Sequence, residues 1–199
     1  MLDNVYKESL RSMIYSFGNL YYIDGNGNRL RVKTTHGNPE RIAGKLKADN
    51  TLILPMITIV ETKTTPDLAR GRYQSIIIEK AWDPTKLKAT RVLSLPPRPV
   101  NISYEINIWA KYKANLDQIV EQIRLMFNPH LVIKNSYTNV AQAFIEQESD
   151  NSTFETSDRQ DRIIRRTFTI KLEGYIPNPR FLVTSTGEVE QFNSEATIY

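Results

Sequence analysis

The spacing of hydrophobic residues in the first quarter of the chain switches between a helical period and strand-like segments. Apolar residues recur at three- and four-residue intervals over residues 2–17, which predicts an amphipathic helix that ends at Gly18. Residues 20–23 and 30–33 are apolar segments on either side of Asp24-Gly25-Asn26-Gly27-Asn28, and this arrangement predicts a β-hairpin. Residues 38–46 begin with a capping residue, a proline and an early glutamate, which predicts a short helix.

The next part of the chain has the residue types of strands. Residues 53–62 are rich in β-branched residues with apolar side chains on both faces, which favours a central strand or a strand buried at a subunit contact. Polar residues 62–67 predict the end of this strand, and residues 73–80 predict another strand.

Strict alternation of apolar and polar residues from Val100 to Ala110 predicts a half-buried strand. Trp109 interrupts its polar face, and we expect a helix of the same chain to cover this ring. A helix follows, for which Asn115 and Gln118 have the spacing of a capping box and Asn128-Pro129 marks the end. Further strands are predicted over residues 131–133, 140–148 and 164–173.

Together these elements predict an α+β fold with a mainly antiparallel β-sheet and helices packed on one face. The length of 199 residues suits one domain. We expect a single domain over residues 1–179 and, beyond Pro177-Asn178-Pro179, an extended C-terminal arm over residues 180–199.

Composition narrows the classes of function. The chain has no cysteine, which excludes disulfide frameworks, thiol nucleophiles and thiolate metal sites. The formal net charge is +4. Residues 176–199 hold one arginine and three glutamates, a net charge of −2, so residues 1–175 carry a net charge of +6. Neither a signal peptide nor an apolar run long enough to span a membrane is visible, so we expect a protein made in the cytosol that does not enter membranes.

The residues that usually carry catalysis are few and scattered. The two histidines, His36 and His130, lie beside turn residues and outside any metal-binding spacing. The run from Asp24 to Asn28 resembles the start of a calcium loop, but Arg29 and Thr35 occupy the positions that require glycine and glutamate. Nucleotide-binding and hydrolase motifs are lacking. We therefore expect no enzyme, no cofactor and no metal.

Basic residues gather in two places and leave two interpretations open. Lys63, Arg70 and Arg72 belong to one predicted loop, and Arg159 begins a second group with residues 162, 165 and 166. Such groups are typical of a nucleic-acid-binding module. Interleaved aspartates lower the local charge, however, and favour ion pairs within or between subunits.

Several stretches in order along the chain resemble the tail sheath stabiliser, or tail completion, proteins of contractile-tailed bacteriophages. They are residues 6–23 with Ser16-Phe17-Gly18-Asn19-Leu20, the Pro96-Pro97-Arg98-Pro99 entry into a long strand, residues 119–129 ending in Phe127-Asn128-Pro129, and residues 165–175. The resemblance extends from about residue 6 to residue 179. The chain departs from the family by its short 48–72 region and its brief C-terminal arm.

The resemblance implies a structural virion protein with a tail-terminator-like fold. It would form a homo-hexameric ring at the head-proximal end of the tail, end the tube, hold the last sheath ring and join the tail to the neck. Its partners would be the tail tube, tail sheath and neck or connector proteins, with DNA only passing through the lumen. The candidate interface residues are Lys63, Arg70, Arg72, Trp109, Arg159, Phe181 and Phe192. We expect that deletion of residues 176–199 weakens ring or sheath attachment and leaves the domain folded.

Overall fold

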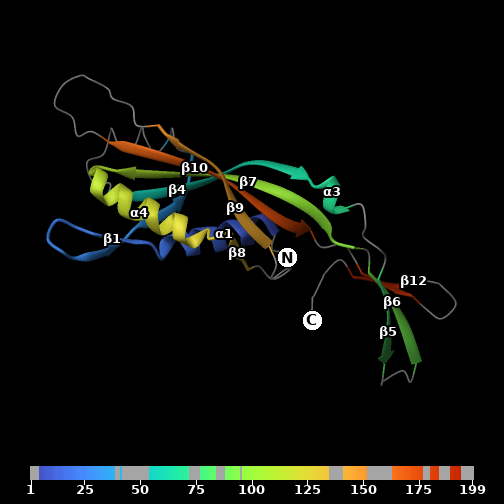
Figure 1. Ribbon diagram of the computed structural model, residues 1–199. Helices are drawn as coiled ribbons and strands as arrows, with labels where there is room; N and C mark the ends of the chain where they lie inside the picture. Colours follow the sequence, from blue (N-terminus) through green and yellow to red (C-terminus); the bar gives the residue numbers. More distant parts are fainter. Residues whose placement is uncertain are drawn as a thin grey trace.

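A computed structural model of the chain describes residues 5–38, 41, 54–71, 77–83, 88–94, 96–134, 141–151, 163–176, 180–183 and 189–193. The molecule is elongated. A large twisted sheet carries two long helices along one face, and a smaller sheet lies at one end (Figure 1).

The large sheet has six strands in the order β3-β4-β7-β10-β9-β8. In that order they are Lys33–His36, Met56–Pro66, Arg98–Ala110, Ile164–Ile176, Ala141–Asp150 and Leu131–Ile133. Neighbours are antiparallel except β3 and β4, which are parallel. Strands β7 and β10 pair over 13 residues, with Arg98 opposite Ile176 and Ala110 opposite Ile164. This pair forms the centre of the sheet.

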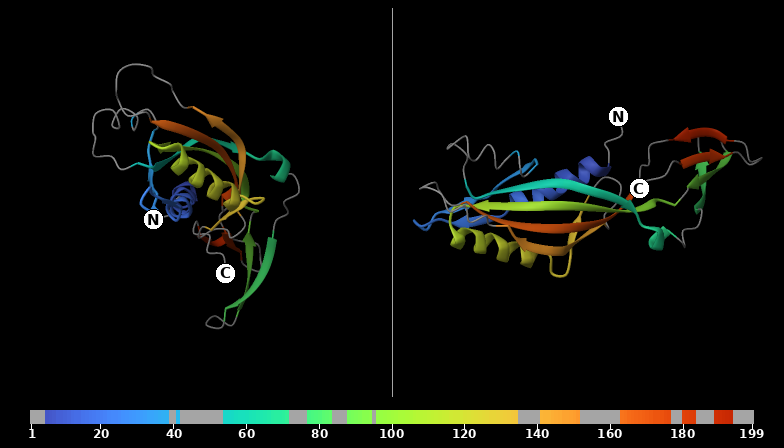
Figure 2. Two further views of the ribbon diagram at one scale, coloured as in Figure 1. Left: turned by 60° about the vertical axis from the view of Figure 1, so that its left-hand side comes forward. Right: turned by 90° about the horizontal axis from the view of Figure 1, so that it is seen from above.

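The hydrophobic core lies between this sheet and helices α1 (Val5–Gly18) and α4 (Lys113–Met126), which cover one face of it (Figure 2). Alternate residues of β7 supply the sheet side of the core, as the period of two predicts. The fully buried residues include Ile102, Tyr104, Ile106 and Ile108 from β7, Met13 and Phe17 from α1, and Leu116, Ile119 and Ile123 from α4. The α+β fold with helices on one face is therefore confirmed.

A hairpin of β1 (Tyr21–Ile23) and β2 (Arg29–Arg31) follows α1. Its turn is closed by Asp24, whose Oδ1 accepts hydrogen bonds from the backbone N–H groups of Asn26 and Asn28 at 2.9 and 2.8 Å. Gly27 has a φ of +81°, a conformation that favours glycine. The Asp24 carboxylate thus serves the turn, and the bond from the Asn28 backbone holds its pKa below the usual value.

Two glutamines of α4 attach this hairpin to the helix. Gln122 accepts a hydrogen bond from the Tyr21 N–H at 3.3 Å and donates one to the Tyr21 carbonyl at 2.7 Å. One turn earlier, Gln118 accepts from the Ile23 N–H at 2.9 Å and donates to the Ile23 carbonyl at 3.4 Å. The side-chain amides thereby take the place of a neighbouring strand along the free edge of β1.

The smaller sheet, here called the distal sheet, has the strand order β12-β11-β6-β5, and all its neighbours are antiparallel. Its strands are Val189–Asn193, Arg180–Val183, Lys88–Ser94 and Ile77–Asp83. It lies beyond the ends of β7 and β10, at the opposite end of the molecule from the β1–β2 hairpin (Figures 1 and 2). The short helix α3 (Leu68–Gly71) lies near the junction of the two sheets.

Most predicted elements are confirmed within a few residues, and two local predictions are wrong. Strand β4 does not end at Thr62, because a bulge between Glu61 and Lys63 resets the register and pairing with β7 continues to Pro66. Helix α4 has no side-chain cap and starts after Tyr112, so Asn115 lies inside its first turn, and Gln118 bonds to the hairpin. The predicted helix over residues 38–46 and the first residues of the predicted strand 73–80 fall largely outside the described residues.

The glutamine attachment predicts a local effect of substitution. Replacing Gln118 and Gln122 by alanine leaves the backbone groups of Tyr21 and Ile23 without their partners, so we expect the hairpin to open far more often while the core of the six-stranded sheet is unaffected. Hydrogen exchange should become at least about tenfold faster at these two amides, since about 1.4 kcal/mol corresponds to a factor of ten, and unchanged at Ile106. Replacing the exposed Glu121 by alanine serves as the matched control, and equal exchange in both variants would contradict the assignment.

Candidate assembly surfaces

The described residues contain no cluster of catalytic side chains around either histidine. His36 ends the edge strand β3, and the His130 ring lies 5.7 Å from the Phe144 ring. Within the ranges that the structure describes, no group of three His, Asp or Glu side chains could hold a metal ion, and no helix there is long and apolar enough to cross a membrane. The features that remain are surfaces and polar clusters.

The first cluster ties α3 to the start of β7 at the junction of the two sheets. Arg70 donates to the Asp67 carboxylate at 2.7 Å, to the Val100 carbonyl at 3.1 Å and to Asn101 Oδ1 at 2.9 Å. Asn101 in turn donates to Asp67 at 3.3 Å, and the Arg70 guanidinium lies 5.1 Å from the Tyr175 ring of β10. This junction cluster fixes α3 against the start of β7, close to the end of β10.

Charge in the junction cluster is balanced locally. The side-chain and backbone hydrogen bonds from Arg70 lower the pKa of Asp67 from 3.8 to about 2. Burial of the guanidinium would lower the pKa of Arg70, but the bond to Asp67, with Tyr175 and the charge of Glu173, raises it overall. Arg70 is therefore held inside its own chain, with 23% of its side chain exposed.

The second cluster lies on the face of the six-stranded sheet away from the helices. Asn107 is fully buried there and joins Arg165, Thr167 and Glu105. Its Oδ1 accepts bonds from Arg165 and Thr167, both at 2.8 Å, and its Nδ2 donates to Glu105 at 2.8 Å. Arg165 also pairs with Glu105 at 3.2 Å. The centre of this outer face is thus polar, and its side chains form hydrogen bonds with one another.

Trp109 lies next to this cluster and is covered in a way that the sequence does not predict. Its side chain points away from α1 and α4, is 5% exposed and packs with Met56, Leu54 and Ile163. The indole N–H donates to Thr58 at 3.3 Å, and the Arg165 guanidinium lies 5.0 Å from the ring. Among the described residues, those that pack on this ring come from the sheet's own strands and the residues next to them, and the expected covering helix stays a prediction.

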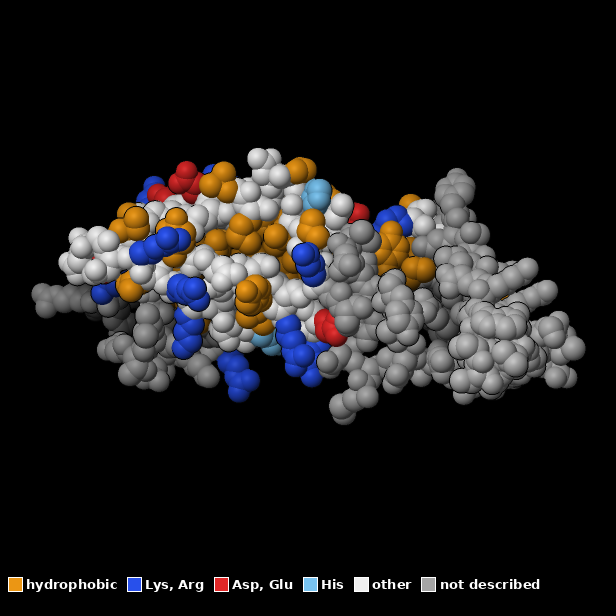
Figure 3. Space-filling model, turned by 90° about the horizontal axis from the view of Figure 1, so that it is seen from below, with side chains coloured by type: hydrophobic (Ala, Val, Ile, Leu, Met, Phe, Trp, Pro, Cys, Tyr) orange, Lys and Arg blue, Asp and Glu red, His pale blue; other side chains and the backbone are white. Residues whose placement is uncertain are grey.

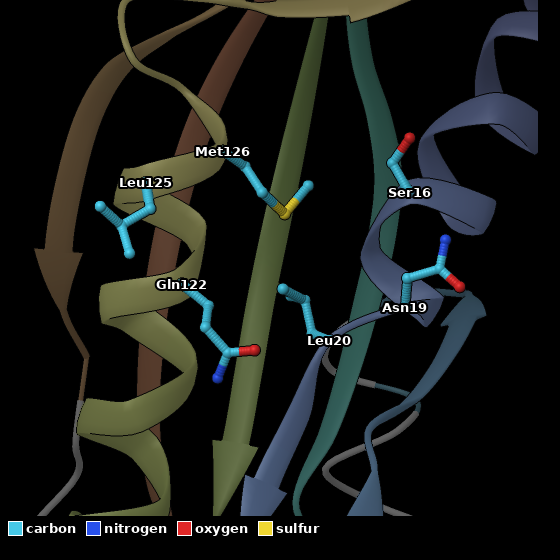
Figure 4. A pocket seen from close by; sticks show the side chains of 6 residues that line it. All are labelled: Ser16, Asn19, Leu20, Gln122, Leu125 and Met126. Carbon is cyan, nitrogen blue, oxygen red and sulfur yellow. The ribbon is translucent and has the colours of Figure 1, made fainter.

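A groove opens between the two helices on the other side of the molecule. Ser16, Asn19 and Leu20 line one wall, and Gln122, Leu125 and Met126 line the other (Figure 4). Tyr15 and Leu125, with 75% and 68% of their surfaces exposed, add apolar area to this side. Figure 3 shows hydrophobic side chains gathered across this side of the body, with Lys and Arg side chains beside them.

The seven candidate interface residues fall in different places. Lys63 is exposed on β4, opposite Ser103 and directly after the bulge. Phe181 and Phe192 are paired with one another in the distal sheet. Arg70 and Trp109 are engaged within the chain, as described above, and Arg72 and Arg159 lie outside the described residues. The assignment of these seven residues to an interface stays a prediction.

What sequence reasoning missed is the exposed basic segment on the β1–β2 hairpin. Arg29, Leu30 and Arg31 are all exposed. The alternation of basic residues over positions 29–33 was the available signal, but it is short and lies outside the two arginine-rich regions.

The junction cluster predicts a pH-dependent contribution to stability. The pKa of Asp67 is depressed on folding, so its contribution is present above about pH 4 and is lost as the pH falls toward 2. We expect the wild-type protein to exceed Asp67→Asn in free energy of unfolding at pH 6, and the difference to shrink between pH 4 and pH 2. Urea unfolding of both proteins across this range measures it. A difference that is constant with pH would contradict the role of the ionised carboxylate.

Comparison with known proteins places the chain in a family. The family model described as T4-like virus Myoviridae tail sheath stabiliser matches residues 4–197, which is nearly the whole chain. No curated protein matches the sequence. In the described parts of the structure, the polar clusters are hydrogen-bonded within the chain and no group of catalytic side chains is present. This arrangement suits a structural component of a contractile tail. The chain belongs to the tail sheath stabiliser family of T4-like Myoviridae phages.

Proposed function

We propose that the protein forms a six-membered ring at the head-proximal end of the phage tail, where it ends the tube, holds the last ring of sheath subunits and joins the tail to the neck. The observation that carries this proposal is the family match over residues 4–197. Membership in a tail sheath stabiliser family indicates a non-enzymatic component of the virion. In the proposed ring, DNA passes through the lumen, and the partners are tube, sheath and neck or connector proteins.

The form of the subunit supports a ring of head-to-tail contacts. The hairpin and the distal sheet lie at opposite ends of an elongated body and differ in structure (Figure 1). A contact between two different surfaces of identical subunits is heterologous, and it closes into a ring when the rotation between neighbours divides a full turn evenly. Two unlike ends provide such a pair of surfaces.

The distal sheet is the element that we assign to assembly contacts. Ile78, Leu93, Phe181 and Phe192 occupy one register row across all four strands. All four positions of this row are apolar residue types in the sequence. None of the three described helices lies across that sheet (Figure 2). An apolar row of this kind favours packing against another protein.

Lys63 is the second contact that we propose, because it is exposed on the outer face of the six-stranded sheet. Arg70 and Trp109 act indirectly in this proposal. Arg70 fixes the junction that carries the distal sheet, and Trp109 stabilises the end of β7. Arg72 and Arg159 stay candidates from the sequence alone.

The alternative function, a nucleic-acid-binding module, receives no specific support. Three arginines of its basic groups are paired within the chain: Arg70 with Asp67, Arg165 with Glu105, and Arg166 with Glu148 and Asp150. Their charges are therefore balanced by carboxylates of the same chain, which weakens their attraction for phosphates.

A mass measurement tests the ring directly. Native mass spectrometry of the purified protein, alone and after incubation with sheathless tail tubes, should give a species of six copies in at least one condition, because the contacts proposed here join copies of one chain. A protein that stays monomeric in both conditions, and that does not sediment with the tubes, would overturn the proposed function.

A truncation tests the role of the distal sheet. Removing residues 180–199 deletes β11 and β12 but leaves every strand of the six-stranded sheet, including the β7–β10 pair up to Ile176. We expect the truncated protein to retain its core and to unfold cooperatively. We also expect it to lose most of its ability to keep the sheath on the tails, and electron microscopy measures this as the fraction of tails that keep an extended sheath. Deletion of residues 194–199 alone is the control. Full sheath retention by the 180–199 deletion would refute the assignment.

A further inference from the structure

The groove between α1 and α4 is an apolar recess on the surface of the described chain (Figure 4). We call it the helix groove, and its lining residues are Ser16, Asn19, Leu20, Gln122, Leu125 and Met126. Its volume of about 450 Å³ is enough to receive several side chains. Leu125 at its rim is 68% exposed, and Tyr15, next to Ser16, is 75% exposed. Apolar area of this kind favours contact with another protein.

One end of the helix groove carries a cation from the hairpin. The Leu20 carbonyl accepts a hydrogen bond from the Val32 N–H at 2.9 Å, which places the preceding residue, Arg31, next to this end. Arg31 is also opposite Tyr21 in the hairpin, and Tyr21 bonds through its backbone to Gln122. Arg31 is exposed and forms no ion pair with any described residue. Its charge is therefore available to a partner.

The other end of the helix groove carries a second cation. Ser16 donates a hydrogen bond to the Ser12 carbonyl at 2.9 Å, and Ser12, one turn further from the hairpin, donates to the Lys134 carbonyl at 2.6 Å. Lys134 directly follows β8, is exposed and forms no ion pair with any described residue. The helix groove thus has an apolar middle and one unpaired cation beyond each end.

The helix groove lies along the side of the elongated molecule and not at either end (Figures 1 and 2). In the proposed ring, neighbouring copies meet through the two unlike ends of the subunit, so this side is available to a different protein. The α1 wall from Ser12 to Asn19 measures about 10 Å along the helix axis. That length suits two turns of a docked helix whose apolar face fits between α1 and α4.

The charges around the helix groove specify the docked helix further. Arg31 and Lys134 lie at its ends, whereas Glu121, one turn before Leu125, is an exposed acidic residue beside its middle. Carboxylates near the ends of a docked helix would face cations, and carboxylates in its middle would face like charge. Nucleic acid suits this surface less well, because phosphates are charged throughout and do not require apolar walls.

We propose that the helix groove docks an acidic amphipathic helix of another tail protein. In this contact, apolar side chains of the docked helix pack against Leu125 and Met126, and carboxylates near its two ends pair with Arg31 and Lys134. The contact rests on the proposed function, because it assumes a place in the tail. It adds a docking surface along the body to the contacts proposed for the two ends of the subunit.

Charge reversal at both ends of the groove tests the ionic part of this contact. We expect Arg31→Glu with Lys134→Glu to weaken binding to purified tails assembled without this protein at least about tenfold at about 50 mM salt, because like charges then face each other. At about 1 M salt, where the screening length is about 3 Å, the variant and the wild-type protein should bind alike. Leu125→Asn should weaken binding at both salt concentrations, because salt does not screen apolar contacts. Co-sedimentation with the tails measures these affinities.

Matched controls separate the helix groove from net charge and from exposed leucines in general. Lys7→Glu with Lys113→Glu makes the same change of net charge at exposed positions. Lys7 precedes Ser16 by nine residues and Lys113 precedes Gln122 by nine, so each lies half a turn round its helix from the groove. Leu68→Asn removes a leucine that is 73% exposed on α3. Both controls should bind tails like the wild-type protein.

A photo-crosslinker identifies the occupant of the groove. A benzophenone amino acid in place of Leu125 should link the protein in assembled tails to one segment of another tail protein. That segment should combine apolar residues at helical spacing with acidic residues near both of its ends. Crosslinks only to copies of this chain, crosslinks only to DNA in complete particles, or the absence of any crosslink would overturn the proposal.

Native mass spectrometry keeps the failure of this contact apart from the failure of the proposed function. If the wild-type protein neither forms a six-membered ring nor binds tails, the proposed function fails. If it forms rings and either does not bind tails or binds them equally well after the groove substitutions, the docking contact is wrong and the ring stands. Loss of the ring by Arg31→Glu with Lys134→Glu would make the groove a contact between copies and would also overturn the docking of another protein.

Discussion

The 13-residue pairing of β7 with β10 is the interaction on which the rest of the structure depends. One side of this pair supplies the buried residues on which α1 and α4 pack, and the other side carries the Asn107 cluster. The strands extend past the helices to the junction, where Arg70 bonds to Val100 and faces Tyr175. A long central pair of this kind gives the subunit its length and separates its two ends.

Polar side chains help to attach the hairpin and helix α3 to this centre, beside the buried Leu20, Tyr22 and Val32 that join the hairpin to the core. Gln118 and Gln122 hold the hairpin against α4, and the junction cluster of Asp67, Arg70 and Asn101 holds α3 against β7. Such bonds specify direction while contributing modest stability, on the order of 1 kcal/mol each. They suit elements whose position matters for contacts with other proteins.

The family assignment agrees with the absence of a catalytic cluster among the described residues. A tail sheath stabiliser is a structural component, and the described surfaces of this chain offer contact areas rather than reaction chemistry. Charge is arranged accordingly. Arg70, Arg165 and Arg166 are neutralised within the subunit, whereas Arg31 and Lys33 have no partner among the described residues.

The sequence by itself determined the fold class and most elements, because the period of hydrophobic residues reports directly on which face of a helix or strand is buried. Val100 to Ala110 is the clearest case. Only the tertiary structure decided how polar side chains are used, since hydrogen-bond partners such as Gln122 and Tyr21, or Arg165 and Asn107, lie 101 and 58 positions apart. It likewise decided that the folded chain covers Trp109 and leaves Arg29 and Arg31 exposed, because the burial of a side chain depends on what packs against it, which local pattern does not encode.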